Sequence, residues 1–580
     1  MKTDGNYRGF LTPIKNIKII LISLPLKIKL LVAFLLIFGT GNLIFYFHQI
    51  NIDYLTEVPV TSGSMTEGVI GTPRFINPLL ASSDVDRDLT TLIYSGLMRR
   101  QADGSLALDL AQDYTSSDDL KTYTFILKNN LTWHDGKPLT SSDIAYTIKT
   151  IKNSDIGHSN QTLWNNINVE IKNDRELSFV LNKPFPGFLE MATLGILPKH
   201  IWENTEVSNF TFSDFNINPI GSGPYKVNKI KKDVASIPTA YELVPFENFA
   251  LNGPYISQVN FRFYPNEQLL FEAYKKNEID SLSNISPYFV NTIRLEGKRI
   301  ITTPLPRVFG LFFNQNQNPA FTQKEVREAL DIAIDKDHIV KNILNGYGTV
   351  VNGPLSPQTF GYEAIKSDSQ INKRAEIATQ KLLTGGWKKN SDGLLSKNIN
   401  GSNTLLKLTI TTTESEELET IANFVKTEWE KIGASVDVVV LDQNTLNQEV
   451  IRPRKYDVLF FGMIVSNETD LYSFWHSSGR NDPGLNVSLY TSVNTDSLLD
   501  KLESTEDKNL KRDLVRQIQS NIVADSPAVF LYSPYFIYTT KNEVQNIDLK
   551  YLIKSSDRLL EIYNWYLKTE RVWPIFNKTN

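Results

Sequence analysis

The chain has 580 residues, of which 41% are hydrophobic and 21% charged, a composition typical of a globular protein. It contains no cysteine, which excludes a disulfide framework, a thiolate metal site, a cysteine nucleophile and a lipid-modified N-terminal cysteine. The formal net charge is −4, and no basic face for nucleic acid is present. At this length we expect two to four domains.

The N-terminus predicts a membrane anchor. Residues 1–29 carry six Lys or Arg and one Asp, and residues 30–47 (LLVAFLLIFGTGNLIFYF) form an uncharged, largely apolar run. At about 1.5 Å per residue the run is roughly 27 Å long, enough to cross a bilayer core. The positive-inside rule places residues 1–29 in the cytoplasm and the bulk of the chain on the extracytoplasmic side. A cleaved signal peptide is the alternative, but no small-x-small cleavage site follows.

Residues 131–148 (LTWHDGKPLTSSDIAYTI) place His134 beside Asp135, which raises the question of an acid–base pair. The Asp-Gly-Lys-Pro sequence that begins at Asp135 is typical of a turn. Thr140 and Asp143 then have capping-box spacing, and isoleucines follow at helical intervals. Neighbouring side chains diverge, so the stretch predicts a strand, a turn and a capped helix rather than a catalytic dyad.

Further strands and helices alternate along the chain. Strand patterns occur at residues 122–128 and 258–264, and strands expected to be more fully buried occur at 436–441 and 456–461. Three helices are expected: one from Thr322, with Glu325 completing a capping box, one ending at Gly346, and one before Pro527. Mixed elements over this length indicate α/β or α+β lobes.

Residues 110–148 resemble the signature region of the family 5 extracellular solute-binding proteins, the dipeptide, oligopeptide and nickel receptors of ABC importers. Other segments are similar to the same family, in the family's order. They are GTPRFINPLLASSDVDRDLTTLIYSGLMR (71–99), NPIGSGPYKV (218–227), KKNEIDSL (275–282), LFFNQNQNPAFTQKEVREALDIAID (311–335) and DSPAVFLYSPYF (525–536).

The resemblance implies an α/β, two-lobed periplasmic-binding-protein fold of type II, in the large three-domain cluster, with a hinge and an interlobe cleft. The ligand is enclosed when the lobes close around the hinge. Mapped onto this chain, the resemblance implies three domains after the membrane helix. They are domain I (62–100, 215–305 and 527–580), domain II (101–214) and domain III (306–526).

In the family's peptide receptors an acidic residue of domain III pairs with the ligand's α-amino group. The matching segment here is residues 456–478, where alignment of Asp470 with the family's Asp-Pro pair places Asn467 at the amine-pairing position. Asn467 brings no charge, and Leu471 replaces the usual proline. Glu468 or Asp470 is therefore the candidate substitute, with capping of the following helix as the alternative role of Asp470.

The remaining ligand-binding candidates are aromatic or polar. They are Ser83, Asp84, Arg307, Phe309, Tyr472 and Trp475. Ser83 and Asp84 align with a segment that approaches the ligand backbone. Arg307 and Phe309 lie near the expected hinge and cleft rim. The arginine would neutralise a ligand carboxylate. For Ser83 and Asp84 the alternative is an exposed loop, and for Arg307 it is a surface ion pair. For Tyr472 and Trp475 the alternative is packing in the core.

These features predict a membrane-anchored, extracytoplasmic substrate-binding protein of an ABC importer that captures dipeptides or oligopeptides and delivers them to permease subunits. The alternatives are a receptor for a nickel chelate or another small solute, and a tethered peptide sensor or chaperone. An enzyme is not expected, because the sequence has no G-x-S-x-G, no metal-ligand spacing and no Ser/Lys motif. We expect a monomer on the cytoplasmic membrane with no cofactor and no nucleic-acid partner.

Overall fold

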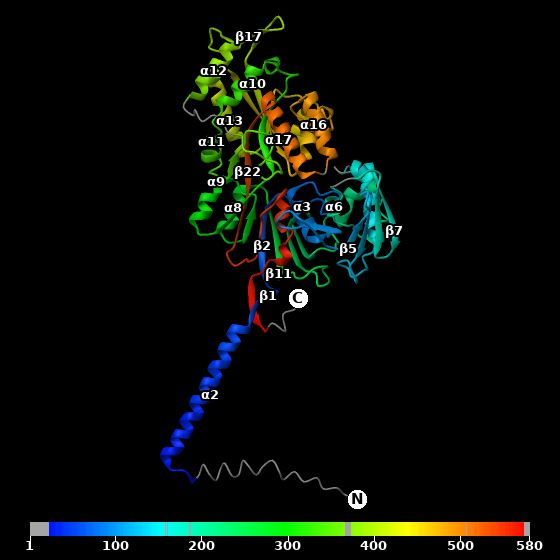
Figure 1. Cartoon of the computed structure of the whole chain (residues 1–580), viewed down its shortest axis with the longest axis vertical. Helices are drawn as coiled ribbons and strands as arrows, with labels where there is room; N and C mark the ends of the chain where they lie inside the picture. Colours follow the sequence, from blue (N-terminus) through cyan, green and yellow to red (C-terminus); the bar gives the residue numbers. More distant parts are fainter. Residues whose placement is uncertain are drawn as a thin grey trace. The chain divides into compact units, whose positions relative to one another are not determined.

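A computed structural model describes residues 23–573, except residues 157, 159–160, 185–186, 366–372 and 506 (Figure 1). It forms two compact units: one contains the chain ends, up to Val60 and from Lys568, and the other contains Thr61–Leu567. In the first unit, helix α2 (Leu26–Tyr54) precedes an antiparallel pair of strands, β1 (Thr56–Val60) and β23 (Lys568–Val572). By length and composition Leu26–Ile50 could cross a membrane, and this span includes the predicted run.

The second unit is built on a mixed 12-stranded sheet. In sheet order its strands are β20 (Ser435–Leu441), β19 (Lys407–Thr413), β21 (Val458–Ile464), β14 (Arg307–Phe313), β22 (Ala528–Thr540), β12 (Ser281–Ser283), β2 (Ser62–Ile70), β11 (Ile256–Tyr264), β10 (Pro238–Pro245) and β9 (Tyr225–Lys232), while β13 (Arg299–Pro304) and β15 (Gly348–Val350) also pair with β22.

Strand β22 joins the two halves of this sheet. Its first part, Ala528 to Tyr532, pairs with β14, and its second part, Tyr535 to Thr540, pairs with β13 (Figure 1). We call residues 61–305 and 535–567 lobe 1, and residues 306–534 lobe 2. One large cluster of buried apolar residues lies wholly in lobe 1, and two others lie wholly in lobe 2. Each lobe therefore has its own core.

The other elements pack around the sheet. Lobe 1 contains α3 (Asp84–Ile93), α4 (Ser141–Ile151), α5 (Gln161–Asn165), α6 (Phe188–Met191), α7 (Lys199–Trp202), α8 (Glu267–Lys275), α9 (Pro287–Leu295), the pair β3 (Met98–Arg100) and β4 (Leu106–Leu108), and a sheet of β5 (Ala111–Ser116), β6 (Thr122–Leu127), β8 (Glu176–Leu181) and β7 (Ile167–Asn173). Lobe 2 contains α10 (Lys324–Ala333), α11 (Lys336–His338), α12 (Arg374–Thr384), α13 (Glu416–Lys431), α14 (Gln443–Thr445), α15 (Asp470–Trp475), α16 (Val493–Ser504), α17 (Lys508–Asp525) and a small sheet of β16 (Lys388–Lys389), β17 (Leu395–Ile399) and β18 (Ser402–Leu405).

The predicted turn and capped helix of residues 131–148 are present. The N–H of Trp133 donates to the carbonyl of Lys137 at 2.8 Å, and the N–H of Thr140 donates to Asp143 Oδ2 at 2.9 Å at the start of α4. Before the turn only an isolated bridge forms, rather than the predicted strand.

His134 and Asp135 do not form a dyad. His134 Nδ1 accepts a hydrogen bond from the N–H of Gly221 at 3.3 Å, and Nε2 lies 3.1 Å from the carbonyl of Gly223, while Asp135 pairs with His200 at 2.8 Å. Burial lowers the pKa of His134 to about 4, so the ring is neutral and donates through Nε2. His134 is a structural bridge to the Gly-x-Gly-Pro-Tyr turn.

Two local predictions are wrong. The capping box of Thr322 and Glu325 does not form, because a 3₁₀ turn at Pro319–Thr322 precedes α10 and Glu325 pairs instead with Lys397 at 2.7 Å. Strand β20 is not deeply buried: it lies at the edge of the sheet, and Val436 is its one buried residue. An edge strand has a neighbour on one side only, so an apolar sequence does not ensure burial there.

Candidate ligand cleft between the lobes

A cavity of ≈ 510 Å³ lies between the lobes. Lobe 1 lines it with Glu267 and residues 284–287, and lobe 2 lines it with Thr413 and residues 415–418 and 460–462 together with the start of β14. Leu305 and Pro534, next to the two crossings between the lobes, line it as well. We call this space the interlobe cavity.

Strands β14 and β21 form one wall of the cavity. Arg307 pairs with Ile464 across the two strands, and Phe309 pairs with Gly462. The ring of Phe309 stacks on Tyr532, with centroids 5.0 Å apart and planes at 11°. A side chain at position 462 would meet this ring at 2.9 Å, so glycine leaves room for it. The wall is therefore aromatic, with a cation at its edge.

Arg307 is half-buried, and among the described residues its guanidinium has no ion pair within 4.0 Å. Burial lowers the pKa of Arg307, and Asp84, Tyr532 and Glu417 oppose this effect. A partly desolvated guanidinium with free donors suits a planar anion such as a carboxylate.

Acidic side chains line the cavity from both lobes. Glu417 is in the first turn of α13, which begins there because Ser415 caps the helix. Glu417 Oε1 accepts a hydrogen bond from the Tyr532 hydroxyl at 2.9 Å. Across the cavity, Glu267 Oε1 accepts one from the N–H of Ser286 at 2.5 Å. Burial raises the pKa of both glutamates, which is the direction expected for partly desolvated carboxylates.

The start of α3 faces lobe 2 near Arg307 without lining the interlobe cavity. Ser83 is the N-cap: its Oγ accepts from the N–H of Asp86 at 3.1 Å. Asp84 pairs with Arg87 at 2.8 Å. Burial alone would raise the pKa of Asp84, but Arg87, the nearby hydroxyl of Ser555 and the charge of Arg307 together lower it. Asp84 is thus electrostatically coupled to the arginine of the opposite lobe.

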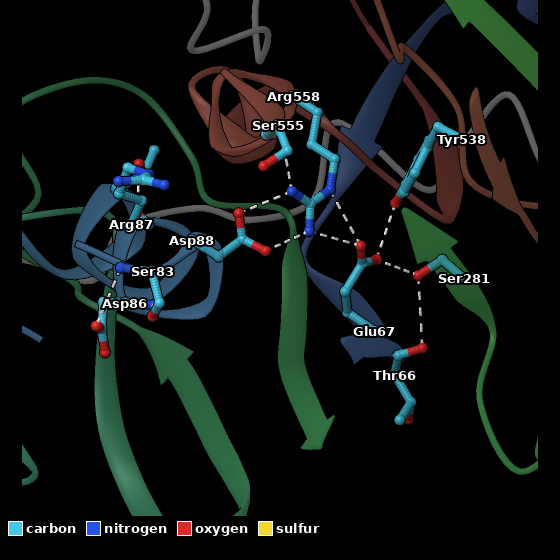
Figure 2. Close-up of polar contacts among 11 residues, drawn as sticks. Thr66, Glu67, Ser83, Asp86, Arg87, Asp88, Ser281, Tyr538, Ser555 and Arg558 are labelled. Atoms are coloured by element: carbon cyan, nitrogen blue, oxygen red, sulfur yellow. Dashed lines mark hydrogen bonds and ion pairs between the residues drawn. The ribbon is translucent and has the colours of Figure 1, made fainter. Parts of the chain in front are cut away.

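A buried ionic network holds α3 in place. Figure 2 shows the guanidinium of Arg558 between the carboxylates of Asp88 on α3 and Glu67 on β2. It donates to Asp88 at 2.8 and 2.7 Å and to Glu67 at 3.1 and 2.8 Å. The second oxygen of Glu67 accepts from Tyr538 at 3.0 Å and from Ser281. The ion-paired side chains are at most 1% exposed, so the network fixes α3 against the central sheet.

Comparison with known proteins shows to which family the chain belongs. The family model for bacterial extracellular solute-binding proteins, family 5 (middle region), matches residues 105–484. The chain belongs to this family. The predicted membership is confirmed, and because the family consists of binding proteins, the prediction that the chain is not an enzyme is confirmed with it.

Two relatives are similar over most of the chain. The oligopeptide-binding protein AppA of Bacillus subtilis (strain 168) is 27% identical over 514 residues, covering 86% of this chain and 93% of AppA. The structure of AppA in complex with a nonapeptide covers 88% of this chain and 100% of its own, with a TM-score of 0.71. NikZ from Campylobacter jejuni in complex with Ni(L-His) is 26% identical, covers 87% of this chain and 99% of its own, and has a TM-score of 0.71. These likenesses confirm the two-lobed periplasmic-binding-protein fold.

In this solute-binding protein the segment at the expected amine-pairing position forms a helix cap. Asn467 is exposed, and its Oδ1 accepts from the N–H groups of Thr469 at 3.0 Å and Asp470 at 3.1 Å. Asp470 Oδ2 accepts in return from the N–H groups of Ser466 at 2.8 Å and Asn467 at 3.1 Å. Both side chains therefore bond to the backbone at the start of α15, and neither lines the interlobe cavity.

The other candidates of this segment do not line the cavity either. Glu468 pairs with Lys511 at 3.3 Å, and Tyr472 stacks on His476 with centroids 4.3 Å apart. Trp475 is fully buried in a core cluster of lobe 2, as the core-packing alternative predicts.

Of the nine candidate residues, the structure places Arg307 and Phe309 on the interlobe cavity and the other seven elsewhere. Glu267 and Glu417, and Tyr532 that bonds to Glu417, were not among the predicted residues. The Ser-Glu-Glu sequence at residues 415–417 indicates the start of a helix. It does not indicate which space that helix end faces.

Proposed function

We propose that this protein is the membrane-anchored substrate-binding component of an ABC importer, that it captures peptides in the interlobe cavity, and that it delivers them to permease subunits. The observation that carries the proposal is the half-buried guanidinium of Arg307, which lines a cavity between two lobes and has no ion pair within 4.0 Å among the described residues. A peptide's carboxylate would supply the missing partner. The likeness to AppA, whose structure contains a nonapeptide, supports the same ligand class.

We propose that α2 is the anchor. Its span Leu26–Ile50 has the length and composition of a membrane-crossing helix, and the lysines and arginines of residues 1–29 favour a cytoplasmic N-terminus. The proposal predicts that the full chain stays in the membrane pellet after carbonate extraction and that protease added outside cells cleaves residues 61–567. Release of a shortened chain that begins after residue 47 would indicate a cleaved signal peptide instead.

The three-domain division inferred from the resemblance is also a proposal. It is supported by the separate sheet of β5 to β8 within residues 101–214 and by the two lobe 2 cores, which are formed mainly by residues 306–526 and also include residues 528–532, beyond the inferred end of domain III. Residues from Lys568 onward group with the N-terminal unit rather than with domain I.

A metal chelate is the second candidate ligand, favoured by the likeness to NikZ with Ni(L-His). Among the described residues no group of three or more His, Cys, Asp or Glu is arranged to hold a metal ion. A chelating ligand would then supply most of the coordination, with Arg307 binding its carboxylate.

Native mass spectrometry of the detergent-solubilised full chain, as purified from its host, tests this proposal. We expect added masses that fragment as short peptides. Arg307→Gln should weaken binding of a captured peptide about 10-fold or more, because a charge-assisted hydrogen bond contributes about 1.5–3 kcal/mol. Arg516→Gln, on an exposed ion pair, is the matched control and should change nothing. One discrete metal-containing mass would support the second candidate. Absence of any ligand, with no thermal stabilisation by a tryptic peptide mixture, would overturn peptide capture.

A further inference from the structure

Three carboxylates reach the interlobe cavity from opposite lobes. Glu267 is the first residue of α8 in lobe 1, and Glu416 and Glu417 are the first two residues of α13 in lobe 2. Arg307 is the one cationic residue among the described residues that line the cavity. The lining therefore carries an excess of negative charge, with the cation on the strand wall and the acids at the two helix starts.

These carboxylates lack cationic partners. Among the described residues, none of the three forms an ion pair within 4.0 Å. Glu267 and Glu417 each accept a hydrogen bond from a neutral donor, the N–H of Ser286 and the hydroxyl of Tyr532. One carboxylate oxygen of each residue is thus left for a ligand, and partly buried anions without a counter-charge favour binding of a cation.

The acids of the two lobes also affect each other across the cavity. Burial is the largest effect that raises the pKa of Glu417, and the charge of Glu267 raises it further. The hydrogen bond from Tyr532 and the charge of Arg307 lower it. The pKa of Glu267 is raised by burial and by the charge of Glu416. This mutual repulsion between lobes would be relieved by a positive group placed between them.

We propose that Glu267 and Glu417 together bind a cationic group of the ligand, an ammonium or a guanidinium, between the two lobes. This inference rests on the proposed function and deepens it: the favoured ligands are peptides that carry a positive charge toward the acids and a carboxylate toward Arg307. Glu416 is exposed at the rim and adds negative potential there. The cation comes either from the peptide's N-terminus or from a lysine or arginine side chain.

The test uses the full chain in detergent and isothermal titration with alanine-based peptides of three to five residues that contain one lysine. Each peptide is compared with two analogues, here called its partners: one has norleucine in place of lysine, and the other has an acetylated N-terminus. We expect at least 10-fold weaker binding for one partner. Weaker binding of the norleucine peptide assigns the cation to the side chain, and weaker binding of the acetylated peptide assigns it to the N-terminus. Equal binding of all three peptides overturns the inference and leaves peptide capture intact.

Glu267→Gln and Glu417→Gln keep the side-chain shape and a hydrogen-bond acceptor, so both should fold. Each should lose the preference for the cationic peptide while still binding its neutral partner. Glu419→Gln, on the exposed side of the same helix start, is the matched control and should retain the preference. A preference that survives in both cavity variants overturns the assignment.

If no peptide binds, the proposed function fails, and the cation site is then tested by itself with arginine and cadaverine in thermal shift. Stabilisation of the native chain but of neither cavity variant supports the site. No stabilisation of the native chain overturns it.

Discussion

Replacement of Arg558 by methionine tests whether the buried network holds lobe 1 together. The guanidinium donates two hydrogen bonds to Asp88, two to Glu67 and one to the carbonyl of Ser555. Without it, two carboxylates with side-chain exposures of 0 and 1% lose their counter-charge. Breaking a buried ion pair by removing one partner costs about 3–5 kcal/mol, because the remaining charge stays desolvated.

Thermal unfolding of the full chain in detergent, followed by tryptophan fluorescence at pH 7, measures this cost. With about 2–4 °C lost per kcal/mol for domains of 150–250 residues, Arg558→Met should lower Tm by roughly 6–20 °C. Arg516→Met is the control, because its ion pair with Asp513 is exposed, and it should change stability by less than about 1 kcal/mol. A loss below about 3 °C for Arg558→Met would refute the reasoning.

A second variant separates lost charge pairing from lost packing. Combining Arg558→Met with Glu67→Gln and Asp88→Asn removes both uncompensated carboxylates and should recover most of the lost stability. The single variant should also recover as the pH falls. Burial raises the pKa of Asp88 to about 6 even beside Arg558, and loss of the arginine removes a charge that lowers it, so the folded variant holds a proton that the unfolded chain loses and is favoured by acid. A triple variant as unstable as the single one would assign the loss to packing.

Other predictions test individual sites. Burial raises the pKa of Asp109 from 3.8 to about 6, so the folded chain keeps a proton that the unfolded chain loses between these values. Stability should therefore fall by up to about 3 kcal/mol as pH rises through this window, and Asp109→Asn should flatten a plot of Tm against pH. Gly221→Ala places Cβ 1.8 Å from the carbonyl oxygen of Ile93, whereas Gly136→Ala meets no atom within 4 Å. Urea unfolding should show a loss of more than about 3 kcal/mol for the first and about 1 kcal/mol for the second, and the reverse order would contradict this. Trp475→Ala should cost about 3–5 kcal/mol in the same assay while leaving peptide affinity within about twofold, because the ring lies in the core.

Local sequence signals predicted local structure well where nothing else competed for the same residues. The turn after Trp133 and the cap of α4 by Thr140 and Asp143 depend on contacts within a few residues, and both are present. Thr322 and Glu325 have the same spacing, but Pro319 starts a 3₁₀ turn that uses the threonine hydroxyl, and Lys397 pairs with the glutamate. The spacing rule fails there because both side chains make other contacts.

The candidate site was harder to predict because the interlobe cavity is lined by distant parts of the chain. Family resemblance identified Arg307 and Phe309, which line the cavity. Glu267 and Glu417 begin two helices in different lobes, and each is an ordinary first-turn acid in its own segment. Only the packing of the lobes brings them to one space, and no periodicity or spacing in the sequence encodes that meeting.

The contrast between Asn467 and Arg307 explains where ligand recognition can lie in this chain. A short polar side chain at a helix start has unpaired backbone N–H groups within reach, and both Asn467 and Asp470 are bonded to such groups. Binding a ligand through either would require breaking those bonds. Arg307 lies on a strand whose backbone groups are paired with β21, so its guanidinium has no local acceptor of this kind. We therefore expect a charged ligand group to be bound by a side chain that has no partner of its own, on a segment whose backbone groups are already hydrogen-bonded.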